Sequence, residues 1–168
     1  MATCNRCNRT LKNPEAIRLG YGKVCYAKML AERESEKEKE YADNQLSSAD
    51  YPLDESIVAI RQNESLYTNV PRLVTHHSPT GYEIAYGGSG PADFALNIVE
   101  NLLRRIGYKG EKTNDTWDKR PVFKKTFELH QDFKWAFVAS MDRNGGAIKT
   151  NTAIAWIEAH LETQKTLF

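Results

Sequence analysis

Three cysteines near the N-terminus have the spacing of a metal-binding knuckle. Two residues separate Cys4 from Cys7, and seventeen separate Cys7 from Cys25. A C-x2-C pair lets both sulfur atoms reach one tetrahedral ion, while the intervening backbone N–H groups can donate to the thiolates. No second cysteine follows Cys25 at two to four residues, so the sequence does not identify a fourth ligand. We expect zinc at this cluster; three structural or free thiols are the alternative.

A glycine-rich segment, Tyr86-Gly87-Gly88-Ser89-Gly90-Pro91, stands between an expected strand and the best-formed expected helix. Glycines let backbone N–H groups turn toward one point, and the dipole of a helix N-terminus favours an anion there. Neither a P-loop nor G-x-G-x-x-G is present. The segment is either an anion cradle or a tight turn whose glycines permit close packing. The candidate ligand-binding residues are Tyr86, Gly87, Gly88, Ser89, Gly90 and Asp93.

No established catalytic motif appears, because H-E-x-x-H, G-x-S-x-G and the P-loop are all absent. His76 and His77 follow each other in an extended segment and would point to opposite faces. His130 shares a stripe with phenylalanines, so it is interpreted as a core-edge histidine. Glu83 and Asp93 flank the glycine segment and could form a carboxylate pair. We expect a protein that is not an enzyme, with catalysis beside the glycine segment as a third hypothesis.

Hydrophobic periodicity predicts the helices that position these residues. The clearest spans residues 91–106, where seven apolar side chains fall on one stripe at helical spacing and Gly107 ends the helix. Two further helices are expected over residues 122–141 and 152–163, the second capped by Asn151.

Short strands are expected over residues 66–75 and 82–86, before the first of these helices. The sequence therefore predicts an α+β fold in which a small antiparallel sheet packs on about three helices. Trp117, Trp135 and Trp156 are interpreted as core or core-edge residues. A tryptophan that lies near the glycine segment could stack a nucleobase.

Composition divides the 168 residues into three expected parts. These are a cysteine-rich, zinc-knuckle-like module over residues 1–30, a charged helical linker over 31–65 that becomes irregular near residue 51, and an α+β glycine-motif domain over 66–168. With 40% apolar residues, wholesale disorder is excluded. The longest apolar runs are about five residues and no apolar segment follows Met1, so we expect a cytoplasmic protein without a membrane span or secretory signal.

Charge is unevenly distributed, although the whole chain carries only +1. Residues 1–31 carry a net charge of +5, residues 32–65 carry −6, and residues 66–168 carry +2. The first part therefore favours a nucleic-acid partner. Its basic residues are Arg6, Arg9, Lys12, Arg18, Lys23 and Lys28.

Both motifs resemble segments of phage proteins. The cysteine segment resembles a short phage and prophage module with the pattern C-x-x-C-G-R-x-L, D-P-x-S and G-x-G-P-x-C; here Asn8 and Lys23 replace a glycine and a proline. Residues 78–96 are similar to a phage-associated family of unknown function with a Y-G-G-S-G-P-A core, and residues 130–139 and 154–157 resemble its later helices. The resemblances imply a metal-stabilised knuckle and a mobile-element setting in the host cytoplasm, but no activity.

Two functions are expected from these features. The first is a non-enzymatic phage or prophage accessory protein that binds a phosphate-bearing, nucleotide-type small molecule at the glycine segment. By analogy with the way a small non-catalytic phage protein could act, it would sequester a host signalling nucleotide and so counter a host defence component. The second is a zinc-stabilised adaptor that binds nucleic acid or protein through residues 1–30. The sequence leaves homo-oligomerisation open.

Overall fold

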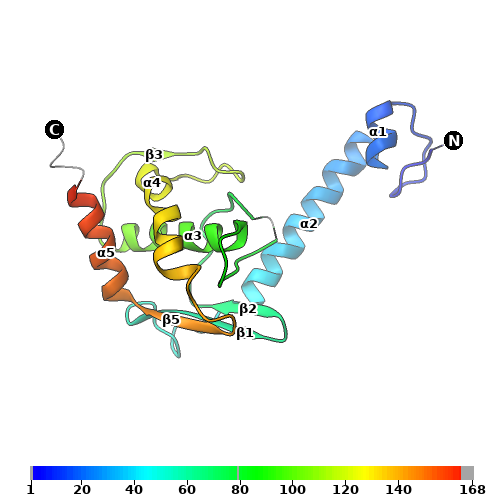
Figure 1. The fold of residues 1–168 in the computed structure, drawn as a ribbon. Helices are drawn as coiled ribbons and strands as arrows, with labels where there is room; N and C mark the ends of the chain where they lie inside the picture. The colour runs from blue at the N-terminus through cyan, green and yellow to red at the C-terminus, as the bar shows by residue number, and fades with distance from the viewer. Residues whose placement is uncertain (1, 79, 164–168) are drawn as a thin grey trace. The chain divides into compact units, whose positions relative to one another are not determined.

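The computed structural model describes residues 2–78 and 80–163. The chain forms two compact units, Met1–Asp43 and Asn44–Phe168 (Figure 1). Pro79, just before the predicted strand over residues 82–86, and residues 164–168, at the end of the expected third domain, lie outside the described residues.

The N-terminal unit is shaped by local contacts. A bridge between Thr3 and Thr10 closes the turn that carries the first two cysteines. The side chain of Asn13 accepts two backbone N–H groups in the first turn of α1 (Pro14–Leu19), and Gly20 ends this helix with a φ of 74°. No residue of α1 is buried. The caps therefore define this helix, and packing contributes little.

α2 (Lys23–Asp43) is one continuous helix that runs from the third cysteine through the mixed-charge segment. The helix expected over this segment is confirmed, because glutamates and lysines are good helix formers and pair at helical spacing. The boundary expected near residue 30 falls inside α2, and the boundary between the two compact units falls after Asp43.

The C-terminal unit contains an antiparallel sheet with the strand order β2-β1-β5. β1 (Ser56–Gln62) pairs with β2 (Ser65–Thr68) on one side and with β5 (Gly145–Lys149) on the other. Ile57 and Ala59 of β1 are buried, because alternate side chains of a strand face the same side of the sheet. β1 is therefore the central strand. It pairs with its neighbour in the sequence, β2, and with the distant β5.

The sheet differs from its prediction in three places. Irregular chain is expected between residues 51 and 65, but β1 lies there; its apolar run is short and flanked by polar residues. The strand expected over residues 66–75 ends early, because the Asn69 side chain takes over backbone groups of β1. The strand expected over residues 82–86 is absent, since no strand pairs with it and Ala85 has a φ of 69°.

α3 (Ser89–Arg105) confirms the helix predicted over residues 91–106. Its residues from Gly90 to Glu100 are all buried. This helix is covered on several sides, because α4, η1 and the segment before it all contact it. Polar side chains on α3 are therefore buried together with the apolar stripe.

The helix predicted over residues 122–141 is divided in the structure. β4 (Val122–Phe123) pairs with β3 (Lys112–Thr113), α4 (Lys124–Phe133) follows, and η1 (Lys134–Val138) is a π-helical segment. Glu100 of α3 accepts the N–H of Phe123 at 3.0 Å, which holds the chain in the extended conformation just before α4 begins. The helical prediction is thus correct for the middle of the range and wrong at its start and over its last three residues, 139–141.

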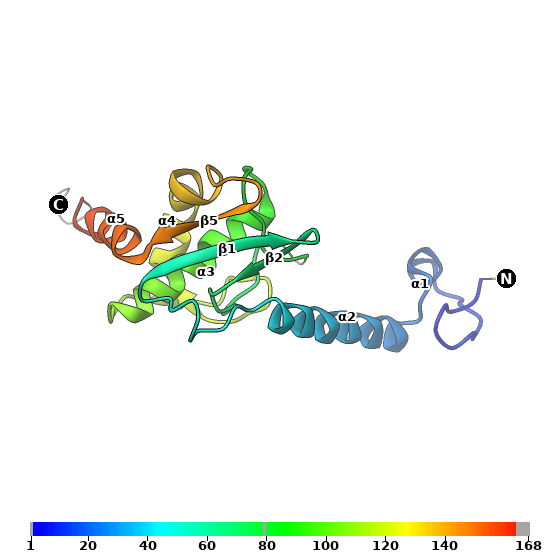
Figure 2. The same ribbon diagram turned by 90° about the horizontal axis from the view of Figure 1, so that it is seen from below.

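α5 (Thr150–Thr163) begins two residues before its predicted start, because the Thr150 hydroxyl donates to the carbonyl of Leu53 at 2.6 Å. Figures 1 and 2 show the sheet on one side of α3, with α4 and α5 on other sides of the unit. The predicted α+β fold with a small antiparallel sheet is confirmed. In the described parts of the chain, no helix combines the length and apolar character that crossing a membrane requires.

Candidate functional site

The N-terminal unit brings the three cysteines together. The Sγ atoms of Cys4, Cys7 and Cys25 all lie within 4.8 Å of one another, and those of Cys7 and Cys25 are 3.5 Å apart. In a tetrahedral zinc–thiolate site, Zn–S bonds of about 2.3 Å place sulfur atoms about 3.8 Å apart. These separations bracket the tetrahedral value, so the three sulfur atoms fit zinc after small shifts. Among the residues that the structure describes, no histidine or acidic group joins this cluster.

Backbone donors favour a thiolate at this cluster. Hydrogen bonds from the backbone of Gly22, and then of Arg6 and Cys7, lower the pKa of Cys4 to about 6. The hydrogen bond with Cys7 is the largest cause that raises the pKa of Cys25 to about 11. Without a metal, the Cys4 thiol therefore loses its proton at a lower pH than the Cys25 thiol. A bound cation would take the place of the remaining thiol protons.

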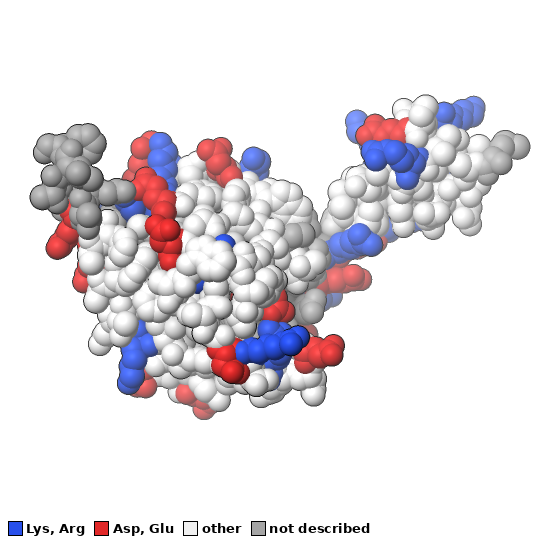
Figure 3. All heavy atoms as spheres, in the orientation of Figure 1, with Lys and Arg blue, Asp and Glu red and all other residues white. Residues whose placement is uncertain are grey.

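The basic residues predicted to contact nucleic acid are all exposed. Arg6 forms a paired contact with Glu32, with N–O distances of 2.5 and 2.6 Å. Figure 3 shows other Lys and Arg side chains of this unit close to α1, with an acidic group among them. The charged side chains of residues 1–31 are therefore mainly basic, with a net charge of +5.

The predicted glycine site is a turn in which three side chains lie directly against glycines. A Cβ atom at Gly87 would lie 2.2 Å from the indole of Trp135, and one at Gly88 would lie 2.1 Å from the Tyr86 ring. A Cβ atom at Gly90 would lie 2.6 Å from Cβ of Glu83. None of the three glycines has a positive φ. Of the two alternatives for this motif, the contacts favour close packing.

Two exposed aromatic rings flank this turn. Tyr86 is 50% exposed and Trp135, which η1 carries, is 61% exposed. Lys134 holds the turn against η1, because its Nζ donates to the carbonyl of Gly87 at 3.2 Å and lies 4.7 Å from the centre of the Trp135 ring. Trp135 is thus the tryptophan near the glycine segment. Ser89, also predicted to bind ligand, is exposed at the start of α3.

Asp93 lies in α3 and is only 1% exposed. Its carboxylate accepts the backbone N–H groups of His76, His77 and Ser78 at 2.7 to 3.3 Å. Asp93 is thus buried, whereas the rings of Tyr86 and Trp135 at the turn are exposed. Its contacts give it the role of holding the preceding segment onto α3, because the carboxylate is engaged by that segment's backbone.

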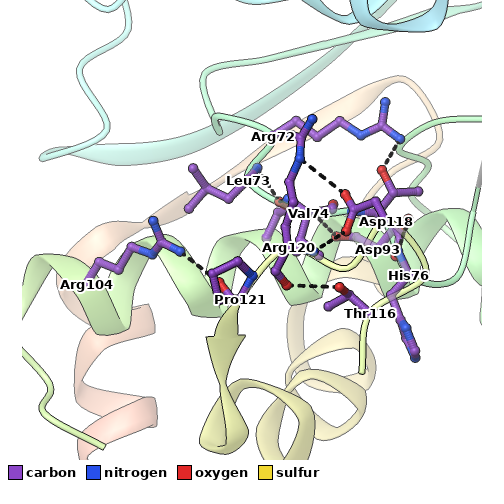
Figure 4. A network of polar contacts seen from close by, with 12 residues as sticks. Arg72, Leu73, Val74, His76, Asp93, Arg104, Thr116, Asp118, Arg120 and Pro121 are labelled. Atoms are coloured by element: carbon purple, nitrogen blue, oxygen red, sulfur yellow. Dashed lines mark hydrogen bonds and ion pairs between the residues drawn. The ribbon is translucent and has the colours of Figure 1, made fainter. Parts of the chain in front are cut away.

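A polar network extends this attachment to the loop before β4 (Figure 4). Asp118 accepts the N–H of Thr75 at 2.7 Å and lies 3.6 Å from the guanidinium of Arg120. The Thr116 hydroxyl donates to the carbonyl of Arg120 at 2.9 Å. The segment that carries His76 and His77 is therefore held by α3 through Asp93 and by this loop through Asp118.

The structure also brings together His77 and His130, which are 53 residues apart. Their Nε2 atoms lie 2.8 Å apart. Nδ1 of His130 faces the carbonyl of Phe127 at 2.9 Å, so that nitrogen carries the proton, and Nε2 accepts from His77 and Gln131. Burial lowers the pKa of His130 to about 4 and also lowers the pKa of His77. Both rings are therefore neutral at pH 7, and the buried position predicted for His130 is confirmed.

Sequence reasoning did not identify the buried polar side chains of α3. The amide of Asn97 accepts the N–H groups of Leu73 and Val74 and donates to the carbonyl of Val74. Glu100 accepts from the Thr126 hydroxyl at 2.7 Å. Asn97 follows Asp93 by four residues and Glu100 follows Asn97 by three, and this helical spacing of polar residues is the signal that could have found them.

Comparison with known proteins finds a similarity for the N-terminal module. No curated protein and no solved structure is detectably similar to the chain. Residues 2–30, which contain the three clustered cysteines, match a family of unknown function (DUF6011).

Proposed function

We propose that the N-terminal unit is a zinc-binding adaptor that binds nucleic acid. The convergence of the Sγ atoms of Cys4, Cys7 and Cys25 within 4.8 Å carries this proposal. Zinc would be held by these thiolates and would supply the fixed centre that the unit's few buried side chains do not provide. The cysteines would then position the turn between Thr3 and Thr10, which carries Arg6 and Arg9, and the start of α2.

Phosphates are the expected contact of the exposed basic residues. Arg6 already pairs with Glu32, so the main cations are the other five, which are Arg9, Lys12, Arg18, Lys23 and Lys28. Each phosphate contact releases a counterion, so affinity should fall steeply with salt.

The test uses the full chain loaded with zinc. Binding to duplex and single-stranded oligonucleotides is measured between about 50 and 200 mM salt. The triple variant Arg9→Ala, Lys12→Ala, Arg18→Ala should reduce the magnitude of the log–log salt slope by about 3 if each side chain contacts one phosphate of a duplex. Zinc content of Cys7→Ser is measured in parallel. Salt-independent affinity would overturn nucleic-acid binding, and capture of a protein instead would assign the module to a protein partner.

A second candidate concerns the C-terminal unit, and the pair of exposed rings beside the glycine turn favours it. Here the protein would be a phage or prophage accessory protein that binds a nucleotide-type ligand, with its base against Tyr86 or Trp135 and its phosphate near Ser89. Exposed aromatic side chains commonly stack nucleobases. The similarity of residues 78–96 to the phage-associated family motivates the setting, including a role against host defence.

Calorimetry against nucleotides and cyclic dinucleotides tests this second candidate. Trp135→Ala should weaken binding by about fivefold or more. Trp117→Ala is the matched control, because Trp117 is 57% exposed and is not one of the rings that contact the turn. The absence of heat with every ligand would remove the proposal. Equal loss in both variants would show that the turn is not the site.

A further inference from the structure

A pocket of about 550 Å³ lies beside the glycine turn. It is lined by side chains from the β1–β2 hairpin, from residues 83–86 and from the turn before β5, which are far apart in the sequence. The volume is in the range of small-molecule sites. Its lining includes Arg61, Glu83, Tyr86 and Arg143.

Arg61 joins the three walls of this pocket. Its guanidinium makes a paired contact with Glu83, at 2.5 and 3.3 Å, and donates to the carbonyls of Glu64 and Arg143 at 3.2 and 3.0 Å. The backbone N–H of Arg61 also donates to the carbonyl of Asn144 at 2.9 Å. The pocket is therefore pre-organised, because one partly buried side chain fixes all three segments.

The glycines of the motif seat two of the lining side chains. The Tyr86 ring lies where a Cβ atom of Gly88 would stand, and Glu83 lies in the same way against Gly90. A Cβ atom at either position would force the neighbouring side chain, Tyr86 or Glu83, to shift from its observed place. The motif thus acts through the side chains that it positions, which explains why its glycines need no positive φ.

The charges of the lining indicate the kind of ligand. Arg61 and Glu83 neutralise each other, whereas no described residue pairs with the exposed guanidinium of Arg143. Glu64 adds an exposed carboxylate at the rim. The half-exposed Tyr86 offers a ring face. An anionic group would pair with Arg143, a planar ring would stack on Tyr86, and the carboxylates would accept N–H groups of that ring.

We infer that this pocket is a binding site for a nucleoside monophosphate or a ligand of the same chemistry, with Arg143 on the phosphate and Tyr86 on the base. This inference deepens the second candidate function and is independent of zinc binding. It places the ligand on the side chains of Tyr86 and Arg143 and does not use Trp135.

Isothermal calorimetry of the zinc-loaded full chain with AMP, GMP, CMP and UMP tests the site. Arg143→Ala should weaken binding by about tenfold or more, because a charge-assisted contact is lost while the backbone carbonyl that Arg61 uses remains. Tyr86→Ala should weaken binding by about fivefold or more, and adenosine or inorganic phosphate alone should bind more weakly than AMP. Lys109→Ala is the control and should bind normally, because Lys109 is an exposed cation of the same unit that does not line the pocket.

Gly88→Ala separates a seating role from a direct one. Gly88→Ala should weaken nucleotide binding as Tyr86→Ala does. The double variant Tyr86→Ala, Gly88→Ala should bind the nucleotide no more weakly than either single variant, because both substitutions remove the Tyr86 ring from the same position. Circular dichroism and melting show that each variant is folded. No heat with any of the four nucleotides, or binding that Arg143→Ala leaves intact, would overturn the pocket. If Trp135→Ala alone abolishes binding, the glycine-turn proposal survives and the pocket does not.

Discussion

The two compact units hold their shape by different means. Among residues 2–43 whose burial is described, Cys4 alone is buried, and α1 has no buried residue. The other unit buries whole side chains such as Phe94 and Phe133 around α3. A unit with so little buried apolar surface needs a cross-link or a metal to remain folded. We therefore expect the stability of one unit to depend on the cysteine cluster and that of the other on the α3 core.

Metal removal should have the largest effect and should be confined to one unit. Structural zinc contributes roughly 10–16 kcal/mol to the folding of small modules, so a chelator should unfold residues 2–30. The tryptophans all lie in the other unit, so Trp fluorescence should not change. Amide NMR spectra with and without chelator check this. Dispersed signals from the module in metal-free protein would show that its turns and caps are sufficient.

Asp93→Ala should destabilise the C-terminal unit by about 3–5 kcal/mol. The substitution leaves three backbone N–H groups without their acceptor in a buried environment. Urea unfolding followed by Trp fluorescence measures the loss. The exposed Asp132→Ala on α4 is the control and should change stability by less than about 0.5 kcal/mol. A stable Asp93→Ala protein that has lost ligand binding would instead support the direct ligand role predicted from the sequence.

The histidine pair should make the C-terminal unit sensitive to acid. Burial lowers the pKa of His130 from 6.5 to about 4, so the unfolded chain binds a proton that the folded chain does not. Stability is then complete above pH 6.5 and falls as the pH decreases toward 4, by about 3 kcal/mol. Urea unfolding at pH 7 and at pH 4.5 measures this dependence of the free energy of unfolding on pH.

His130→Gln should flatten this part of the pH profile. His160→Gln serves as the control, because His160 stacks on Trp156 in α5, apart from the pair. An unchanged slope in His130→Gln would assign the acid sensitivity to other groups.

Asn13→Ala should have the smallest effect and should act on the N-terminal unit. Loss of the cap of α1 costs about 1 kcal/mol. Because folding and metal binding are coupled in such a module, the same loss should weaken zinc affinity by about fivefold. Competition with a chromophoric chelator measures it. Asn13→Asp retains an acceptor and should bind zinc normally; equal weakening in both variants would indicate that the cap is not the cause.

The sequence alone determined the features that depend on near neighbours. The spacing of Cys4, Cys7 and Cys25 predicted a cluster because a C-x2-C turn is local and a third thiol needs only one short return of the chain. The apolar stripe over residues 91–106 predicted α3 because helical periodicity is contained in the helix itself. In both cases the interacting groups are close in sequence, so their types and intervals are sufficient evidence.

The tertiary structure decided the features whose partners are distant. Ala85 alternates like a strand residue, yet the segment has no strand to pair with. From the sequence, Asp93 is an acidic residue in the first turn of a helix. In the structure, residues 76–78 pack on α3 and donate their backbone N–H groups to its buried carboxylate. Arg61 and Arg143 are unremarkable in sequence and meet only because β1 pairs with β5. Burial and hydrogen-bond partners arise from chain segments many residues apart, and local pattern does not contain them.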